Sequence, residues 1–188
     1  MNVLFEAALE IQQFLRDQEW RFCIIGGLAV ARWGRPQATQ DVDLSLLTGF
    51  GNESRYVDPI LARFPGRIAE AGRFALENRV LLLSASNGSP LDICLAGIPF
   101  EERMIGRASP FAFAPDVSLV TCSAEDLVIM KVFAGRQRDW TAVREILVSQ
   151  AEELDWDYIR ENLPPLCELK ETPDSLARLE ELRTQLAE

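Results

Sequence analysis

Two aspartates, Asp41 and Asp43, stand at the head of an apolar run that ends at Leu47. Side chains alternate along a β-strand, so carboxylates two residues apart point to the same side. Two carboxylates on one face of a strand suit a divalent cation. The pattern alone is a weak signal, because any solvated strand end can carry two acids with one residue between them.

Asp92 makes this interpretation more specific. It lies inside a second apolar run, Leu91 to Leu95, where an unpaired carboxylate would be costly to bury. If the two runs form neighbouring strands, Asp41, Asp43 and Asp92 converge on one face. Such a cluster repels itself and is best explained by a divalent cation with oxygen ligands, which predicts Mg²⁺ and makes these three residues the expected metal ligands.

A glycine pair, Gly26 and Gly27, follows the apolar run 22–25 and opens a helix-like segment that closes at Gly34. Without Cβ atoms the backbone can come close to a ligand, and a helix start offers free N–H groups and a positive dipole end. Because Mg²⁺ is usually completed by substrate phosphates, this turn is where a triphosphate would bind. A tight strand-to-helix turn without a ligand is the alternative.

Further candidates lie in the second half of the chain. Lys131 is one of only two lysines and stands in a strongly apolar helical stretch. Its ammonium could contact the triphosphate, or its stem could pack while the amine reaches water. Arg136 and Arg138 could bind phosphates or lie on the surface. Asp139 is placed to cap the helix that follows.

Together these motifs resemble a known superfamily. Gly26-Gly27, then Arg35-Pro36-Gln37-Ala38-Thr39-Gln40-Asp41-Val42-Asp43-Leu44, then Leu91-Asp92-Ile93, are similar to the nucleotidyltransferase superfamily that includes polymerase β. The glycine pair with R-x-x-T-x-D-[VI]-D-L resembles the bacterial AbiEii-like group, which are toxins of type IV toxin–antitoxin and abortive-infection systems, and related uncharacterised proteins. The stretch from Ser123 through Lys131 to Gly135-Arg136-Gln137-Arg138-Asp139 is similar to the helical element of that group.

The resemblance implies transfer of an NMP from an NTP to a hydroxyl with two Mg²⁺ ions. Asp41 and Asp43 would bind both ions, and Asp92 would bind the catalytic ion and help to deprotonate the attacking hydroxyl. In the resembling toxins an aspartate at the position of Asp139 belongs to the active site. The implied acceptor is a tRNA end or a protein hydroxyl, and the implied partner is an antitoxin.

Hydrophobic spacing predicts the elements that must position these residues. The expected fold class is α/β (α+β), with a small mixed-sheet nucleotidyltransferase core in residues 1–122 and a helical region in 123–188. Strands are expected at 21–25, 41–47, 79–83, 91–95 and 117–121, with 79–95 as a hairpin. Helices are expected at 3–17, 27–33, 54–64, 99–107, 123–135, 139–150, 155–163 and 173–187, the last two joined by Pro164-Pro165.

The composition of the 188 residues excludes several kinds of chemistry. The chain has no histidine, which removes Ser-His-Asp and Cys-His catalysis and histidine-ligated zinc. Its four cysteines have no CxxC spacing and indicate buried, reduced thiols. No apolar run is long enough to span a bilayer, and no basic region precedes the first apolar residues, so we expect a cytoplasmic protein without a secretory signal.

The formal net charge of -10 is unevenly placed, since residues 145–188 hold 12 acids and four bases. This acidic end is a solvated helix face or a docking surface for a basic partner, and it does not suit non-specific nucleic-acid binding. The sequence therefore favours a Mg²⁺-dependent nucleotidyltransferase. A non-catalytic nucleotide-binding or interaction module that retains the fold is the alternative, and a purely structural α/β protein is a third possibility.

Overall fold

The computed structural model describes residues 2–36, 38–151 and 153–187, so that Gln37 of the motif quoted above lies outside the described residues. The chain divides into two compact units, one formed by residues 1–29 and 38–122 and the other by 30–37 and 123–188. The division falls within α2 (Gly26–Trp33). None of the helices in the described part of the chain combines the length and the apolar character needed to cross a membrane.

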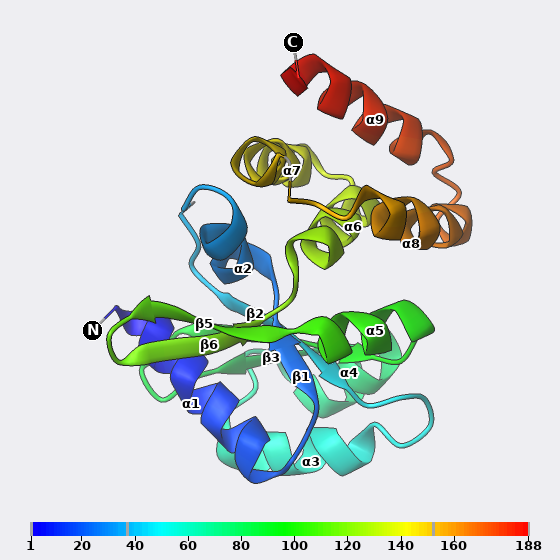
Figure 1. Ribbon diagram of the computed structural model, residues 1–188. Coiled ribbons are helices and arrows are strands. Elements are labelled where there is room, and N and C mark those ends of the chain that lie inside the picture. Colours follow the sequence, from blue (N-terminus) through cyan, green and yellow to red (C-terminus); the bar gives the residue numbers. More distant parts are fainter. Residues whose placement is uncertain (1, 37, 152, 188) are drawn as a thin grey trace. The chain divides into compact units, whose positions relative to one another are not determined.

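The first unit is built on a mixed sheet that has six strands within the described residues, in the order β3-β4-β2-β1-β6-β5 (Figure 1). β2 runs parallel to β4 and β1 runs parallel to β6, whereas the other neighbouring pairs are antiparallel. The mixed α/β class predicted from the sequence is thereby confirmed. The strands are β1 (Phe22–Ile24), β2 (Val42–Leu47), β3 (Val80–Ser84), β4 (Pro90–Ala96), β5 (Ser109–Ala114) and β6 (Val117–Thr121).

Helices cover both faces of this sheet. Figure 1 shows α1 (Val3–Asp17), α3 (Ser54–Arg63) and α4 (Ala71–Asn78) on one face, where they enclose the main hydrophobic core. On the other side α5 (Pro99–Arg107) packs against β1 and β2.

The alternation of side chains in β2 and β4 fixes which face carries the aspartates. Val42 and Leu44 flank Asp43, Leu91 and Ile93 flank Asp92, and all four apolar side chains are fully buried in the core. Burial of each such side chain contributes about 1.5–3 kcal/mol. A shift of register by one residue would exchange these side chains for the carboxylates, so the core holds both aspartates on the opposite face.

The second unit is helical, with α6 (Ala124–Ala134), α7 (Gln137–Gln150), α8 (Trp156–Leu169) and α9 (Asp174–Ala187). α6 begins and ends as predicted: the Ser123 hydroxyl accepts a hydrogen bond from the Asp126 N–H at 3.1 Å, and Gly135 ends the helix with φ +69°. Lys170 donates to the carbonyls of Phe133 and Ala134 at this end. The second lysine of the chain therefore satisfies helix carbonyls that have no intrahelical partner.

Two elements of the first unit were not predicted. α4 buries only small side chains, Ala71 and Ala75, which contribute little hydrophobic signal to the sequence. β5 contains Pro110 and is the edge strand of the sheet, where a proline costs no ladder hydrogen bond on the solvent side.

The predicted break at Pro164-Pro165 is wrong, because α8 continues through both residues. The prolines remove the N–H groups that would bond to the carbonyls of Arg160 and Glu161. Both of those residues are exposed, so water can replace the missing donors. Beyond the prolines Leu166 and Cys167 are buried, and their packing offsets the lost hydrogen bonds.

Candidate active site

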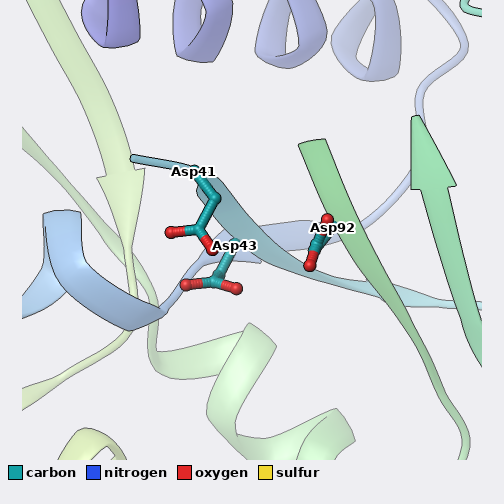
Figure 2. A group of neighbouring side chains, drawn as sticks. All are labelled: Asp41, Asp43 and Asp92. Carbon is teal, nitrogen blue, oxygen red and sulfur yellow. The ribbon is translucent and has the colours of Figure 1, made fainter. Parts of the chain in front are cut away.

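The three predicted carboxylates come together in the first unit. Asp41 stands one residue before β2, Asp43 lies within it, and Asp92 lies in the neighbouring parallel strand β4, where it is the register partner of Asp43. One oxygen from each carboxylate lies within 4.8 Å of the other two. Figure 2 shows the three side chains converging from the two strands. We call this cluster the aspartate triad.

Charge repulsion within the triad calls for a cation. Two unit charges 4.8 Å apart repel by about 3 kcal/mol at an effective dielectric constant of about 20, and less where water screens them. All three side chains are half-buried, so this repulsion is only partly screened. Carboxylate oxygens at this separation fit a hard divalent cation such as Mg²⁺ or Mn²⁺. Asp41, Asp43 and Asp92 are the residues that would hold it.

The thiol of Cys94 lies on the same face of β4 as Asp92, two residues away along the strand. Burial, followed by the nearby charges of Asp43, Glu101 and Asp92, raises the pKa of Cys94 to about 12. Without a bound metal the thiol is therefore neutral at physiological pH, and the cluster of possible metal ligands consists of the three carboxylates. The triad thus offers oxygen donors, which disfavours a soft metal.

The glycine pair packs against the triad and its neighbours. Gly26 has φ +62°, and a Cβ built there would lie 1.9 Å from Oδ2 of Asp43. A Cβ on Gly27 would lie 2.6 Å from the Thr39 side chain. The close approach that we expected toward a ligand is thus made toward two side chains of the chain itself. It places the first residues of α2, where the helix dipole is positive, beside the carboxylate of Asp43.

Two residues that contact the triad were not singled out from the sequence. Thr39 donates to Oδ1 of Asp41 at 2.9 Å, and its place in the R-x-x-T-x-D motif was the available signal. The guanidinium of Arg67 forms an ion pair with the carboxylate of Asp92. Arg67 lies in the turn after Pro65-Gly66, and nothing in its sequence context indicates that contact.

Three of the remaining predicted residues, Lys131, Arg136 and Asp139, bind one another in the second unit, whereas Arg138 is exposed. The Lys131 ammonium lies 3.2 Å from Oδ1 of Asp139, and Nε of Arg136 lies 2.6 Å from Oδ2. The Lys131 side chain is only 18% exposed, so its amine does not simply extend into water.

The sequence predicted Asp139 as the N-cap of α7, and this prediction is wrong. Asp139 is fully buried and is the third residue of the helix. There its carboxylate accepts a hydrogen bond from the backbone N–H of Arg136, which is the N-cap. Burial alone would raise the pKa of Asp139, but the hydrogen bonds from Arg136 and Lys131 outweigh it and hold the pKa below its usual value. The side chain of Asp139, in the first turn, therefore caps the start of α7 by accepting the N–H of the N-cap residue.

Comparison with solved structures shows the same fold in nucleotidyltransferases. The antibiotic-resistance factor ANT(2'')-Ia is 17% identical, with a TM-score of 0.56 over 96% of this chain and 97% of that one. An antigenic nucleotidyltransferase-like protein from Paracoccidioides brasiliensis is 15% identical, with a TM-score of 0.52 over 94% and 92%. The lincosamide antibiotic adenylyltransferase LnuA, bound to lincomycin, is 13% identical, with a TM-score of 0.50 over 75% and 94%.

The search of curated proteins finds no match to the chain. Residues 2–167, most of the chain and all of the triad, match the model of a family described as a nucleotidyltransferase of unknown function, DUF6036. These comparisons do not confirm the AbiEii-like group that the motifs resemble. The chain belongs to the nucleotidyltransferase family DUF6036.

Proposed function

We propose that the protein is a Mg²⁺-dependent nucleotidyltransferase that transfers an NMP from an NTP to a hydroxyl acceptor. The observation that carries the proposal is the register of β2 and β4. It sets Asp43 opposite Asp92 and brings three carboxylate oxygens within 4.8 Å of one another. A purely structural sheet has no need of such a repelling cluster on a half-exposed face.

The residues of the triad have two tasks in this proposal. Asp41 and Asp43 hold the divalent cations, and Thr39 orients the carboxylate of Asp41 through its hydrogen bond to Oδ1. Asp92 would bind at the same centre and accept the proton of the attacking hydroxyl, whose oxygen bonds to the α-phosphorus of the NTP while pyrophosphate leaves. Bound cations would neutralise the triphosphate and polarise the attacking and leaving oxygens of an in-line displacement. Positioning and charge stabilisation supply most of the acceleration.

The start of α2 is the proposed phosphate contact in the first unit. Gly26 lies against Asp43 and Gly27 against Thr39, so a phosphate bound at the triad would lie next to the positive end of this helix. Phosphate binding by Lys131 and Arg136, and an active-site role for Asp139, stay predictions from the sequence.

The acceptor that we propose is a hydroxyl of a tRNA end or of a protein, and the biological role is that of a toxin with an antitoxin partner. Both follow from the motif resemblance, in which the glycine pair precedes R-x-x-T-x-D-V-D-L. LnuA, by contrast, is named as an adenylyltransferase of lincosamide antibiotics. A small-molecule hydroxyl is accordingly included among the acceptors tested.

The test is incubation of the purified chain with each α-labelled NTP, Mg²⁺, and either total tRNA, a cell lysate or a panel of hydroxylated antibiotics. We expect label to appear in one class of acceptor with wild type and not with Asp43→Ala. If wild type labels nothing that Asp43→Ala fails to label, the enzymatic proposal is wrong. NTP binding without transfer would then favour the non-catalytic nucleotide-binding module.

A further inference from the structure

Arg67 contacts the aspartate triad from outside the motifs that define it. Its guanidinium forms an ion pair with Oδ1 of Asp92. The side chains of Arg67 and Asp92 are 31% and 27% exposed, so the pair is partly shielded from water. Partial burial and a charge-assisted hydrogen bond make this a stronger contact than an ordinary surface ion pair.

The backbone holds Arg67 in position for this contact. Its N–H donates to the carbonyl of Leu82 at 2.9 Å, and Gly66 forms an isolated antiparallel bridge with Leu83. The segment 65–67 therefore runs along the outer side of β3. Leu82 is in turn the register partner of Asp92. The Arg67 side chain needs to cross only one strand to reach the carboxylate.

The geometry points to competition between Arg67 and the divalent cation. The oxygen that accepts from Arg67 belongs to the same carboxylate that would ligate the cation. A guanidinium and a dication at one carboxylate repel each other strongly at contact distance. On the premise of the proposed function, we infer that Arg67 is a positioning residue that neutralises Asp92 until a divalent cation displaces it. Arg67 thus lowers the affinity of the triad for the cation when no nucleotide is bound.

The displaced guanidinium has a use when the cation arrives with an NTP. Arginine binds phosphate oxygens with the same planar fork that it offers to a carboxylate. The triphosphate therefore gives Arg67 a new anionic partner, whereas a cation without nucleotide does not. The contact favours binding of the cation together with its nucleotide over binding of the cation alone.

The test measures Mn²⁺ binding to the full chain without nucleotide, by calorimetry and by loss of the electron paramagnetic resonance signal of free Mn²⁺. We expect Arg67→Gln to tighten Mn²⁺ binding about five- to tenfold, the size expected for removal of one partly screened charge. Arg67→Lys keeps the charge and should stay within about twofold of wild type. A residue that only supported the local fold would weaken binding when replaced.

Arg73→Gln is the matched control, because Arg73 lies in the same unit and pairs with Glu70 and Glu77 instead of the triad. We expect its Mn²⁺ affinity to equal that of wild type. Thermal unfolding and circular dichroism establish that each variant is folded.

The outcomes separate the inference from the proposed function. If wild type binds Mn²⁺ through Asp43 and Arg67→Gln binds it no more tightly, the inference about Arg67 is overturned and the proposed function stands. If neither wild type nor Arg67→Gln binds Mn²⁺, or if Asp43→Asn binds it as well as wild type, the proposed cation site is wrong and the inference is overturned with it.

Discussion

The two units hold charged clusters of opposite construction. Around Asp139, two cations converge on one fully buried carboxylate, and both of its oxygens accept hydrogen bonds from them. In the triad, three half-buried carboxylates converge on one another. A fully buried carboxylate whose two oxygens are both held by cations serves stability, whereas three half-buried carboxylates that face one another, of which Asp92 also pairs with Arg67, are prepared for a ligand. Substitutions in the triad should therefore reduce activity without reducing stability, whereas substitution of Asp139 should reduce stability.

The largest effect is expected for Asp43→Asn, which keeps the size of the side chain and removes its charge. We predict at least a roughly 1,000-fold loss of nucleotidyl transfer, because charge neutralisation at the triad is central to the proposed chemistry. The free energy of unfolding without divalent cations should not fall, since repulsion within the triad is relieved.

Transfer of labelled NMP and urea unfolding measure these two quantities for Asp43→Asn. Asp58→Asn, at an exposed position of α3, is the control and should change neither. A large loss of stability in Asp43→Asn would mean that the triad is structural, like the Asp139 cluster.

Gly26→Ala tests the same centre through the backbone. The added Cβ would lie 1.9 Å from Oδ2 of Asp43, and φ at this position is +62°. We expect about a 100-fold loss of transfer, because Asp43 must move, and a loss of about 1–2 kcal/mol in stability. Gly88→Ala is the control, since Gly88 also has a positive φ of +82° but has no atom within 4 Å of an added Cβ. Equal loss of transfer in both variants would show that backbone strain alone is responsible.

At the other cluster, Asp139→Asn should reduce stability. Loss of the buried carboxylate leaves Lys131 and Arg136 without their counter-ion, and we expect a decrease of about 2–3 kcal/mol in the free energy of unfolding, measured in urea. Asp157→Asn, whose side chain is 98% exposed, should stay within about 0.5 kcal/mol of wild type. If Asp139→Asn were as stable as wild type but inactive, the cluster would belong to the active site, as the resemblance implies.

Acid titration sharpens this contrast. The pKa of Asp139 is lowered in the folded protein from its usual value of 3.8. Its contribution is therefore complete well above pH 3.8 and is lost as the pH falls through the lower, folded-state pKa. Urea unfolding between about pH 6 and pH 2.5 should show wild type losing more stability than Asp139→Asn as the pH falls. Parallel curves for the two proteins would contradict the proposed role of the ion pairs.

The smallest effect is expected for Thr39→Val. This variant removes the hydrogen bond to Oδ1 of Asp41, which measures 2.9 Å, but keeps the shape that packs on Gly27. We predict about a tenfold loss of transfer because the Asp41 carboxylate is less well oriented. Thr39→Ser retains the hydroxyl and should keep most of the activity. Equal activities of the two variants would show that the Thr39 hydroxyl does not orient Asp41 for transfer.

The triad could be predicted because strand periodicity and the cost of burying a carboxylate are local properties of the sequence. The shared face of Asp41 and Asp43 follows from the two-residue period of a strand. Asp92 was recognised because a carboxylate is unusual among its apolar neighbours. Arg67 could not be found in this way, since its contact depends on the pairing of Gly66 with Leu83 and of Leu82 with Asp92. Strand pairing between distant segments is not written in either segment alone.

The errors in the fold have similar causes. Pro164 and Pro165 predict a break from local chemistry, but packing of Leu166 and Cys167 on the second unit keeps α8 continuous. β5 was not predicted, and its position at the edge of the sheet, where Pro110 is tolerated, depends on strand pairing that the sequence does not show. Gly26 and Gly27 approach Asp43 and Thr39 closely, neighbours that only the folded chain brings near, and their contact with a phosphate stays a prediction.

The central claim is that the triad is a divalent-cation site. The most direct measurement is an anomalous difference map, at the manganese absorption edge, of crystals grown with Mn²⁺ and a non-hydrolysable NTP. We predict a peak within about 2.0–2.3 Å of carboxylate oxygens of Asp41, Asp43 and Asp92, with the triphosphate beside the start of α2. A peak elsewhere, or nucleotide bound with no manganese at the three aspartates, would contradict the account.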